Sequence, residues 1–194
     1  MSGEGGRRWR AMGLRGCQLP ETITIRSAVA ADVPALCRLA EELVRQHVAY
    51  DRGRYQTPPD VAGAYAGLFA EHVGRPESVV VVAERSDGLV GYVFGVVEPP
   101  SLVALTGPAG WIHDLYVSPA ARGHGAGGRL LDAAVARLRR IGCPGGVLLV
   151  VAVQNAAAAA LFRGRGFRPT LLEMTLGPWP GGDAEPGAAA DGGA

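Results

Sequence analysis

Apolar residues recur with helical spacing in several segments of the chain. In 31–48 and in 127–141 they follow a period of about 3.6 residues, which predicts two amphipathic helices. The apolar face of the first helix holds Leu36, Leu39, Ala40, Leu43 and Val44, and that of the second holds Leu130, Leu131, Ala134, Val135 and Leu138. A weaker helix is predicted over 60–73, and Asn155 can cap a short one over 156–164.

Alternating or continuous apolar runs between these helices predict six strands. They are 21–26, 79–84, 89–97, 111–117, 147–153 and 169–176. The second and third strands are joined across Ser86, Asp87 and Gly88, which read as a hairpin turn. The resulting order of strands and helices predicts one mixed α/β domain over 21–176.

The two ends of the chain hold few residues that could form a core. Residues 1–20 contain an arginine pair but lack the apolar region and cleavage site of a signal peptide. Residues 177–194 are rich in glycine, proline and alanine. We therefore expect a disordered leader and a disordered tail around the domain.

Composition argues against several classes of protein. The formal net charge is +1, so nothing in the charge favours a nucleic-acid partner. No apolar run reaches the roughly 18 residues that a membrane span needs. The three cysteines are widely spaced and form neither a metal pattern nor a disulfide framework. A reducing compartment, and hence a cytoplasmic protein, is the simplest expectation.

A glycine cluster follows the fourth predicted strand. Gly123, Gly125 and Gly128 match the G-x-G-x-x-G spacing of dinucleotide folds, but four residues separate the cluster from the strand and no acid lies about 20 positions on. A P-loop needs a lysine, and the chain contains none. The remaining pattern is R-x-x-G-x-G from Arg122 to Gly127, at the start of a helix. Its backbone N–H groups suit a pyrophosphate without a metal.

Two motifs in this order resemble the GNAT N-acetyltransferase superfamily. DLYVSPAARGHGAGGRLL supplies the [QR]-x-x-G-x-[GA] loop after the fourth strand, and VQNAAAAALFRGRGF supplies an asparagine and an aromatic-bearing helix after the fifth. The similarity is strongest over 111–167 and extends in outline over 22–176. It implies a mixed, mostly antiparallel sheet of six to seven strands, flanked by about four helices and splayed between the fourth and fifth strands.

The resemblance also implies acetyl-CoA as the donor and an amine as the acceptor, with no metal and no covalent enzyme intermediate. Backbone groups of the fourth strand would pair with the pantetheine arm, and the glycine loop would wrap the pyrophosphate. The implied donor-binding residues are Leu115, Tyr116, Val117, Arg122, Gly123, His124, Gly125, Ala126, Gly127, Gly128, Asn155 and Phe162. A plain helix cap at Asn155 and a plain core residue at Phe162 are the alternatives.

Acetyl transfer to an amine needs a group that takes a proton, because a lysine-like amine with a pKa of about 10.4 is protonated at neutral pH. The candidates on the fourth strand are His113 and Asp114, and strand alternation predicts that only one of them faces the acceptor. A histidine suits a base at neutral pH. Ordered water or a carboxylate such as Glu98 is the alternative. Many family members have a tyrosine that acts as a general acid where this chain has Phe162. Phenylalanine cannot donate a proton, so CoA would leave as a thiolate that the protein does not protonate.

Acceptor specificity is expected from the segment between the first two helices. Its candidate contacts are Tyr50, Asp51 and Tyr55. Asp51 could pair with a cationic amine, whereas Arg52 and Arg54 could pair with a carboxylate or phosphate. The charges therefore leave the acceptor open.

The predicted function is transfer of an acetyl group from acetyl-CoA to the primary amine of a small molecule, with a protein amine as an alternative. Two other classes compete with it, an acyl-CoA-binding sensor that has lost catalysis and a dinucleotide-dependent oxidoreductase. Homodimers are common in the family, but the sequence identifies no interface.

Overall fold

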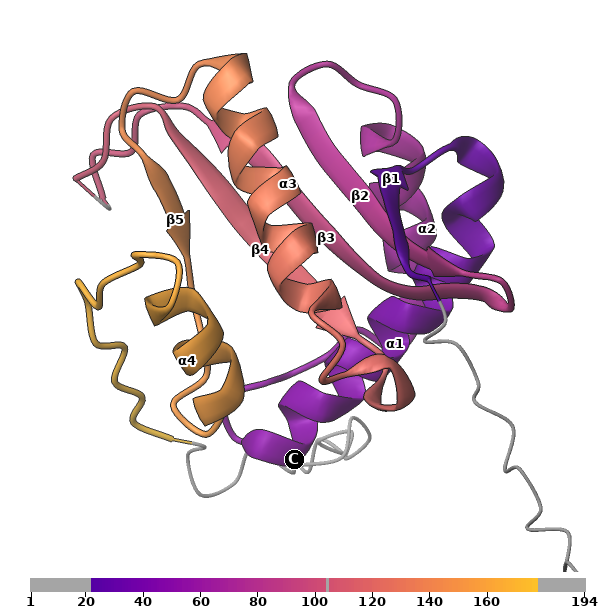
Figure 1. Ribbon diagram of the computed structural model, residues 1–194. Helices are drawn as coiled ribbons and strands as arrows, with labels where there is room; N and C mark the ends of the chain where they lie inside the picture. Colours follow the sequence, from indigo (N-terminus) through magenta and orange to yellow (C-terminus); the bar gives the residue numbers. More distant parts are fainter. Residues whose placement is uncertain (1–21, 104, 178–194) are drawn as a thin grey trace, which may run out of the picture.

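A computed structural model of the chain describes residues 22–103 and 105–177 (Figure 1). The predicted leader and all of the predicted tail except Gly177 lie outside these described residues. The strands are β1 (Thr24–Ser27), β2 (Ser78–Arg85), β3 (Gly88–Glu98), β4 (Ala109–Val117) and β5 (Val147–Leu149). The helices are α1 (Val33–Tyr50), α2 (Val61–His72), α3 (Ala126–Ile141) and α4 (Ala156–Arg163), with short 3₁₀ turns at Ala30–Asp32 and Pro119–Ala121.

The strands form one sheet in the order β1-β2-β3-β4-β5. Neighbouring strands are antiparallel from β1 to β4, and only β4 and β5 are parallel. β5 pairs with β4 at Gly110, Trp111 and Ile112, whereas β4 continues to Val117. The predicted sheet, mostly antiparallel and splayed between the fourth and fifth strands, is therefore confirmed.

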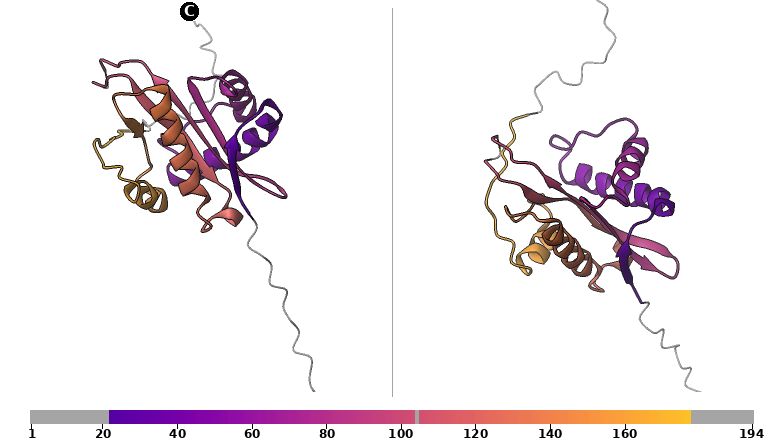
Figure 2. Two further views of the ribbon diagram at one scale, coloured as in Figure 1. Left: turned by 45° about the horizontal axis from the view of Figure 1, so that its top comes forward. Right: turned by 90° about the horizontal axis from the view of Figure 1, so that it is seen from above.

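Helices cover both faces of the sheet (Figure 2). α1 and α2 pack on one face around Leu36, Phe69 and Tyr92, and α3 packs on the other around Leu130 and Leu138. In β2, Val79 and Val81 face α3, whereas Val80 and Val82 face α1 and α2. Because both faces are buried, β2 is continuously apolar rather than alternating.

The predicted number of strands is wrong for the described residues, which form five strands instead of six or seven. The predicted strand over 169–176 lies outside the sheet, and its Leu171, Leu172, Met174 and Leu176 are 74–89% exposed. A strand is stable only where its backbone groups find partners. β5, the edge strand on this side of the sheet, ends after three residues at Leu149 instead of at the predicted residue 153.

Candidate active site

β4 contains a β-bulge at the point where it leaves β5. Phe94 of β3 pairs with Asp114, and the next residue, Gly95, pairs with Ile112, so His113 is an extra residue in β4. His113 stacks on Phe94 with ring centroids 5.7 Å apart, and the Tyr92 hydroxyl donates to Asp114 at 2.9 Å. Phe94 and Tyr92 both belong to the core on the α1 and α2 face.

The bulge therefore turns His113 and Asp114 to the same face of the sheet. The expectation that alternation would separate them is wrong, because alternation holds only where the pairing is regular. Gly95 makes the bulge possible, since a Cβ atom there would lie 2.6 Å from the backbone oxygen of Trp111.

His113 is paired with a carboxylate. Its Nε2 atom lies 3.0 Å from Oε1 of Glu98, and the two side chains are 40% and 41% exposed. Trp111 also stacks on the imidazole, with ring centroids 6.3 Å apart. Glu98, an alternative base in the sequence, is therefore a partner of His113 that can stabilise its protonated form.

Asp114 lies in a much less solvated environment. Burial raises the pKa of this carboxyl group, although the hydroxyls of Tyr92 and Tyr65 donate hydrogen bonds to it and oppose the rise. A carboxylate whose pKa is raised accepts a proton more readily at neutral pH. His113 and Asp114 thus place two proton acceptors side by side.

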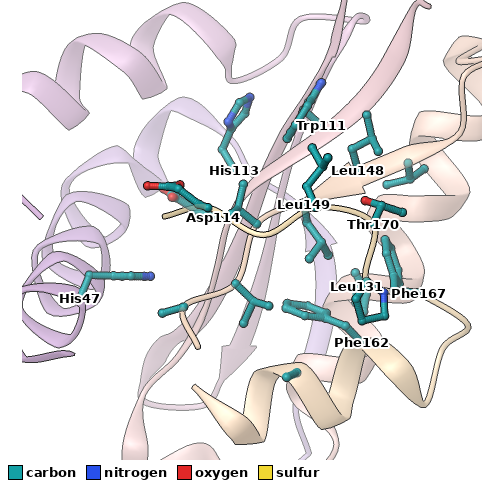
Figure 3. Close-up of a pocket in the computed structure, with 18 of the residues that line it drawn as sticks. His47, Trp111, His113, Asp114, Leu131, Leu148, Leu149, Phe162, Phe167 and Thr170 are labelled. Carbon is teal, nitrogen blue, oxygen red and sulfur yellow. The ribbon is translucent and has the colours of Figure 1, made fainter. Parts of the chain in front are cut away.

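Both residues line a cavity of about 1660 Å³. At one end of it lie His47, Asp51, Tyr55 and Tyr65, contributed by α1, α2 and the linker between them. Toward α3 and α4 the lining includes the apolar side chains Leu131, Phe162 and Phe167 (Figure 3), together with charged ones such as Asp132 and Arg163. The cavity therefore extends from the α1 and α2 side to the α3 and α4 side across the edge of the sheet.

The glycine loop lies beyond the cavity, at the end of β4. Gly123 and Gly125 have φ angles of +82° and +78°, a left-handed conformation that favours glycine. α3 follows directly at Ala126, and the N–H groups of its first turn have no acceptor within the helix. N–H groups at such a helix start can bind an anion.

Arg122 braces this loop. Its Nε atom donates to the backbone oxygen of Val117 and its Nη2 atom to Oε1 of Gln46 on α1, both at 2.8 Å. The guanidinium also lies over the ring of Tyr116, 5.7 Å from its centroid. Arg122 thus connects the loop to β4 and α1.

Residues 38–167 match the model of the acetyltransferase (GNAT) family. The chain belongs to the GNAT acetyltransferase family. This confirms the predicted resemblance, and the predicted acyltransferase class agrees with it.

Two curated relatives and one solved structure illustrate the similarity. The chain is 28% identical over 169 residues to a mycothiol acetyltransferase of Cellulomonas flavigena, covering 85% of this chain but only 46% of that protein. It is 32% identical over 117 residues to the uncharacterised N-acetyltransferase YhfO of Bacillus subtilis, covering 58% of this chain and 68% of YhfO. The aminoglycoside N-acetyltransferase AAC(6')-Iy in complex with CoA shares the fold, with a TM-score of 0.65, 14% identity, and coverage of 83% of this chain and 97% of that one.

The other residues implied in donor binding by this GNAT chain make contacts with the core and with neighbouring elements. Leu115 and Val117 pack on the α3 side, and Tyr116 faces α1, where its hydroxyl donates to Glu42 at 2.8 Å. Burial, together with this bond, raises the pKa of Tyr116 to about 12. Phe162 is 8% exposed and belongs to the core, and Asn155 caps α4 by accepting a hydrogen bond from the Ala158 N–H at 3.2 Å. His124 is exposed, whereas Gly128 is buried in the first turn of α3.

The acceptor candidates lie at the end of α1, which holds Tyr50, and in the linker after it, which holds Asp51 and Tyr55. Oδ1 of Asp51 accepts the N–H groups of Gly53 and Arg54 at 2.9 and 3.1 Å, which folds the linker into a turn. Tyr55 lines the cavity, and Tyr50 accepts a hydrogen bond from Gln46 at 2.9 Å. The guanidinium of Arg54 binds the carboxylate of Glu173 in the C-terminal segment.

Sequence reasoning missed His47, Tyr65 and Glu173 as residues of this cavity. His47 could have been found, because it follows Leu43 by four residues and so continues the buried face of α1. Tyr65 and Glu173 gave no comparable signal, since their positions depend on contacts between distant segments.

The part of the chain that the structure describes holds neither a metal-binding cluster nor a membrane-spanning helix. Within 22–103 and 105–177, three or more histidine, cysteine, aspartate or glutamate side chains do not gather anywhere as a metal site would require. In the same ranges, every helix is too short or too polar to span a membrane.

Proposed function

We propose that this chain transfers an acetyl group from acetyl-CoA to a primary amine of a small molecule. One observation carries the proposal. β4 leaves β5 after Ile112, and the bulge immediately beyond it presents His113 and Asp114 to the cavity. An opening in the backbone pairing and two proton acceptors therefore meet at one point of the sheet.

The donor side of this point suits CoA. Beyond Ile112 the β5-facing edge of β4 is available to pair with an extended amide-containing chain such as pantetheine. At the end of β4, the left-handed conformations of Gly123 and Gly125 and the first turn of α3 supply N–H groups for a pyrophosphate. Arg122 braces the loop that carries them.

The reaction needs the amine in its neutral form. We assign His113 as the base that takes the proton, with Glu98 stabilising the imidazolium that results. The amine nitrogen then attacks the thioester carbonyl, a C–N bond forms, the C–S bond breaks and CoA leaves as its thiolate, while the nitrogen gives its second proton to water. Backbone N–H groups of β4 would stabilise the oxyanion. Phe162 offers no proton, so the departing thiolate is protonated by solvent.

The proposal predicts release of free thiol when the purified protein, acetyl-CoA and a panel of small primary amines are mixed. His113→Gln is expected to lower kcat by roughly 100- to 10,000-fold, the contribution of a positioned base. The control is His72→Gln. His72 lies on α2, bonds to Ser78 at 2.8 Å and is not among the residues that line the cavity.

A catalytically inactive sensor is the competing function, because Phe162 lacks the hydroxyl of a general acid. Binding of CoA without turnover on any amine, and without any gain from Phe162→Tyr, would favour the sensor. Turnover only with peptide amines would instead indicate a protein acetyltransferase.

A further inference from the structure

His47 occupies a position in the cavity that the proposed reaction does not yet use. It lies in the last turn of α1, is half-buried and lines the cavity at the end opposite α4. Its imidazole packs against the rings of two tyrosines, with centroid distances of 6.0 Å to Tyr50 and 4.9 Å to Tyr55. These contacts fix the direction in which the ring points.

The hydrogen bonding of His47 determines which ring nitrogen carries the proton. Nδ1 lies 3.0 Å from the backbone oxygen of Leu43, which can only accept, so Nδ1 is the protonated nitrogen. In the neutral ring, Nε2 then has a free lone pair and is a hydrogen-bond acceptor. Figure 3 shows the ring extending from α1 into the cavity that Asp114 also lines.

Asp114 points back toward α1 from the opposite wall (Figure 3). Its carboxylate is held in place by Tyr92, at 2.9 Å, and by Tyr65. A carboxylate has room for about four hydrogen bonds, so these two tyrosines leave acceptor capacity free. Two acceptors therefore face the same part of the cavity.

Two acceptors that line the same cavity suit a group that only donates hydrogen bonds. An ammonium ion has three N–H donors and no acceptor, whereas a hydroxyl has one donor. We infer that Asp114 and His47 together bind the acceptor amine as its ammonium ion, next to His113, which then takes the proton. This inference rests on the proposed function.

The charged residues near His47 and Asp114 indicate which primary amines the site would accept. Asp51 and Asp114 both line this end of the cavity, and the nearby cation of Arg54 is bound to Glu173. A carboxylate beside the reacting nitrogen would face these acids and lower the affinity. The acceptor class is therefore a primary amine without an adjacent carboxylate, and 2-phenylethylamine should be preferred to phenylalanine.

The test measures the KM of both substrates in the full chain, with 2-phenylethylamine or the best amine of the panel. His47→Asn can keep the bond to the Leu43 oxygen but removes the nitrogen that faces the cavity. It is expected to raise the KM for the amine about 10- to 100-fold, the effect of losing a hydrogen bond to a charged group, while the KM for acetyl-CoA stays unchanged. His47→Gln restores an acceptor near Nε2 and should keep the amine KM within a few-fold of wild type, and His72→Asn is the matched control.

The outcomes separate this inference from the proposed function. If the wild-type protein acetylates no amine, the proposed function fails. If the wild type is active but His47→Asn leaves the amine KM unchanged, or if phenylalanine is preferred to 2-phenylethylamine, the inference is overturned. Should His47→Asn not fold, His47→Phe keeps the ring contacts without either nitrogen, and an unchanged amine KM in that variant would overturn it equally.

Discussion

At the scale of single residues, one extra residue in β4 brings His113 and Asp114 to the same face of the sheet, with Glu98 paired to His113. The sequence identified His113, Asp114 and Glu98 as candidates because their side chains can take protons. It could not show that His113 and Glu98 form a pair or that the bulge brings Asp114 beside them. The bulge depends on how Phe94 and Gly95 of β3 pair with β4. The pattern of apolar positions in β4 does not predict that pairing.

Arg26 on β1 forms ion pairs with two carboxylates, and these pairs lead to a prediction about stability. Its guanidinium binds Asp32 at 2.7 and 3.0 Å and Glu84 at 2.7 and 3.0 Å. The hydrogen bonds from Arg26 hold the pKa of Asp32 below its ordinary value. The Asp32 side chain is only 11% exposed, so solvent screens the pair weakly.

Asp32→Asn is expected to lower the free energy of unfolding by about 1–3 kcal/mol near neutral pH. Because the pKa of Asp32 is lowered on folding, its contribution is full above the unfolded value of about 3.9 and is lost as the pH falls through the folded value. Urea unfolding of both proteins from pH 7 down to pH 3 should show the difference shrinking below about pH 4.

Asp87→Asn is the matched control, because Asp87 pairs with Arg85 at 2.6 Å but is 59% exposed. Its effect should be much smaller than that of Asp32→Asn, as exposed ion pairs contribute little. Equal losses in the two variants would contradict the importance assigned to the buried pair.

At the scale of elements, the periodic pattern predicted every helix and the first five strands, with ends displaced by a few residues. The helices were predictable because each buries one face, as Leu36, Leu39 and Leu43 do in α1. The strand predicted over 169–176 failed because a leucine-rich segment indicates only a tendency to extend, and pairing depends on an available edge. β5 ended early for the same reason, since Val150 and Val153 are 71% and 79% exposed.

The bulge in β4 gives a prediction at this scale. In Gly95→Ala the new Cβ would lie 2.6 Å from the Trp111 backbone oxygen, so β3 and β4 must separate where His113 and Asp114 are positioned. We expect a loss of about 1–3 kcal/mol in stability and at least a tenfold fall in kcat.

Thermal unfolding and thiol release would measure both effects. Gly67→Ala serves as the control, because a Cβ on Gly67 in α2 meets nothing within 4 Å. That variant should be as active as wild type and more stable by about 0.5–1 kcal/mol. Wild-type kcat in Gly95→Ala would show that the bulge does not position the catalytic groups.

At the scale of the whole molecule, the sheet separates two layers that serve different substrates in the proposed reaction. The acceptor end of the cavity is built from α1, α2 and the linker between them, whereas the donor loop leads into α3 on the other face. β4 runs between the layers and contributes to both sites. The two motifs that carry the family resemblance lie on the donor side, which explains why the donor was easier to predict than the acceptor.

Donor binding should therefore stabilise the fold without an acceptor. At a CoA concentration of about 100 times Kd, linkage predicts roughly 2.7 kcal/mol of stabilisation. For a domain of this size, that corresponds to a rise in Tm of roughly 5–10 °C. Differential scanning fluorimetry with CoA, and with NAD and NADP as controls, measures the effect. Protection by a dinucleotide in place of CoA would contradict the proposed donor.

The hydrogen bond between Arg122 and Gln46 would couple the binding of the two proposed substrates. Gln46 immediately precedes His47 on α1, so one guanidinium connects the donor loop to the helix that carries the inferred ammonium ligand. A donor that shifts Arg122 would also shift the affinity for the amine. Because such coupling is reciprocal, the amine would change the affinity for the donor by the same factor. Arg122→Ala should therefore weaken any cooperativity between the two ligands.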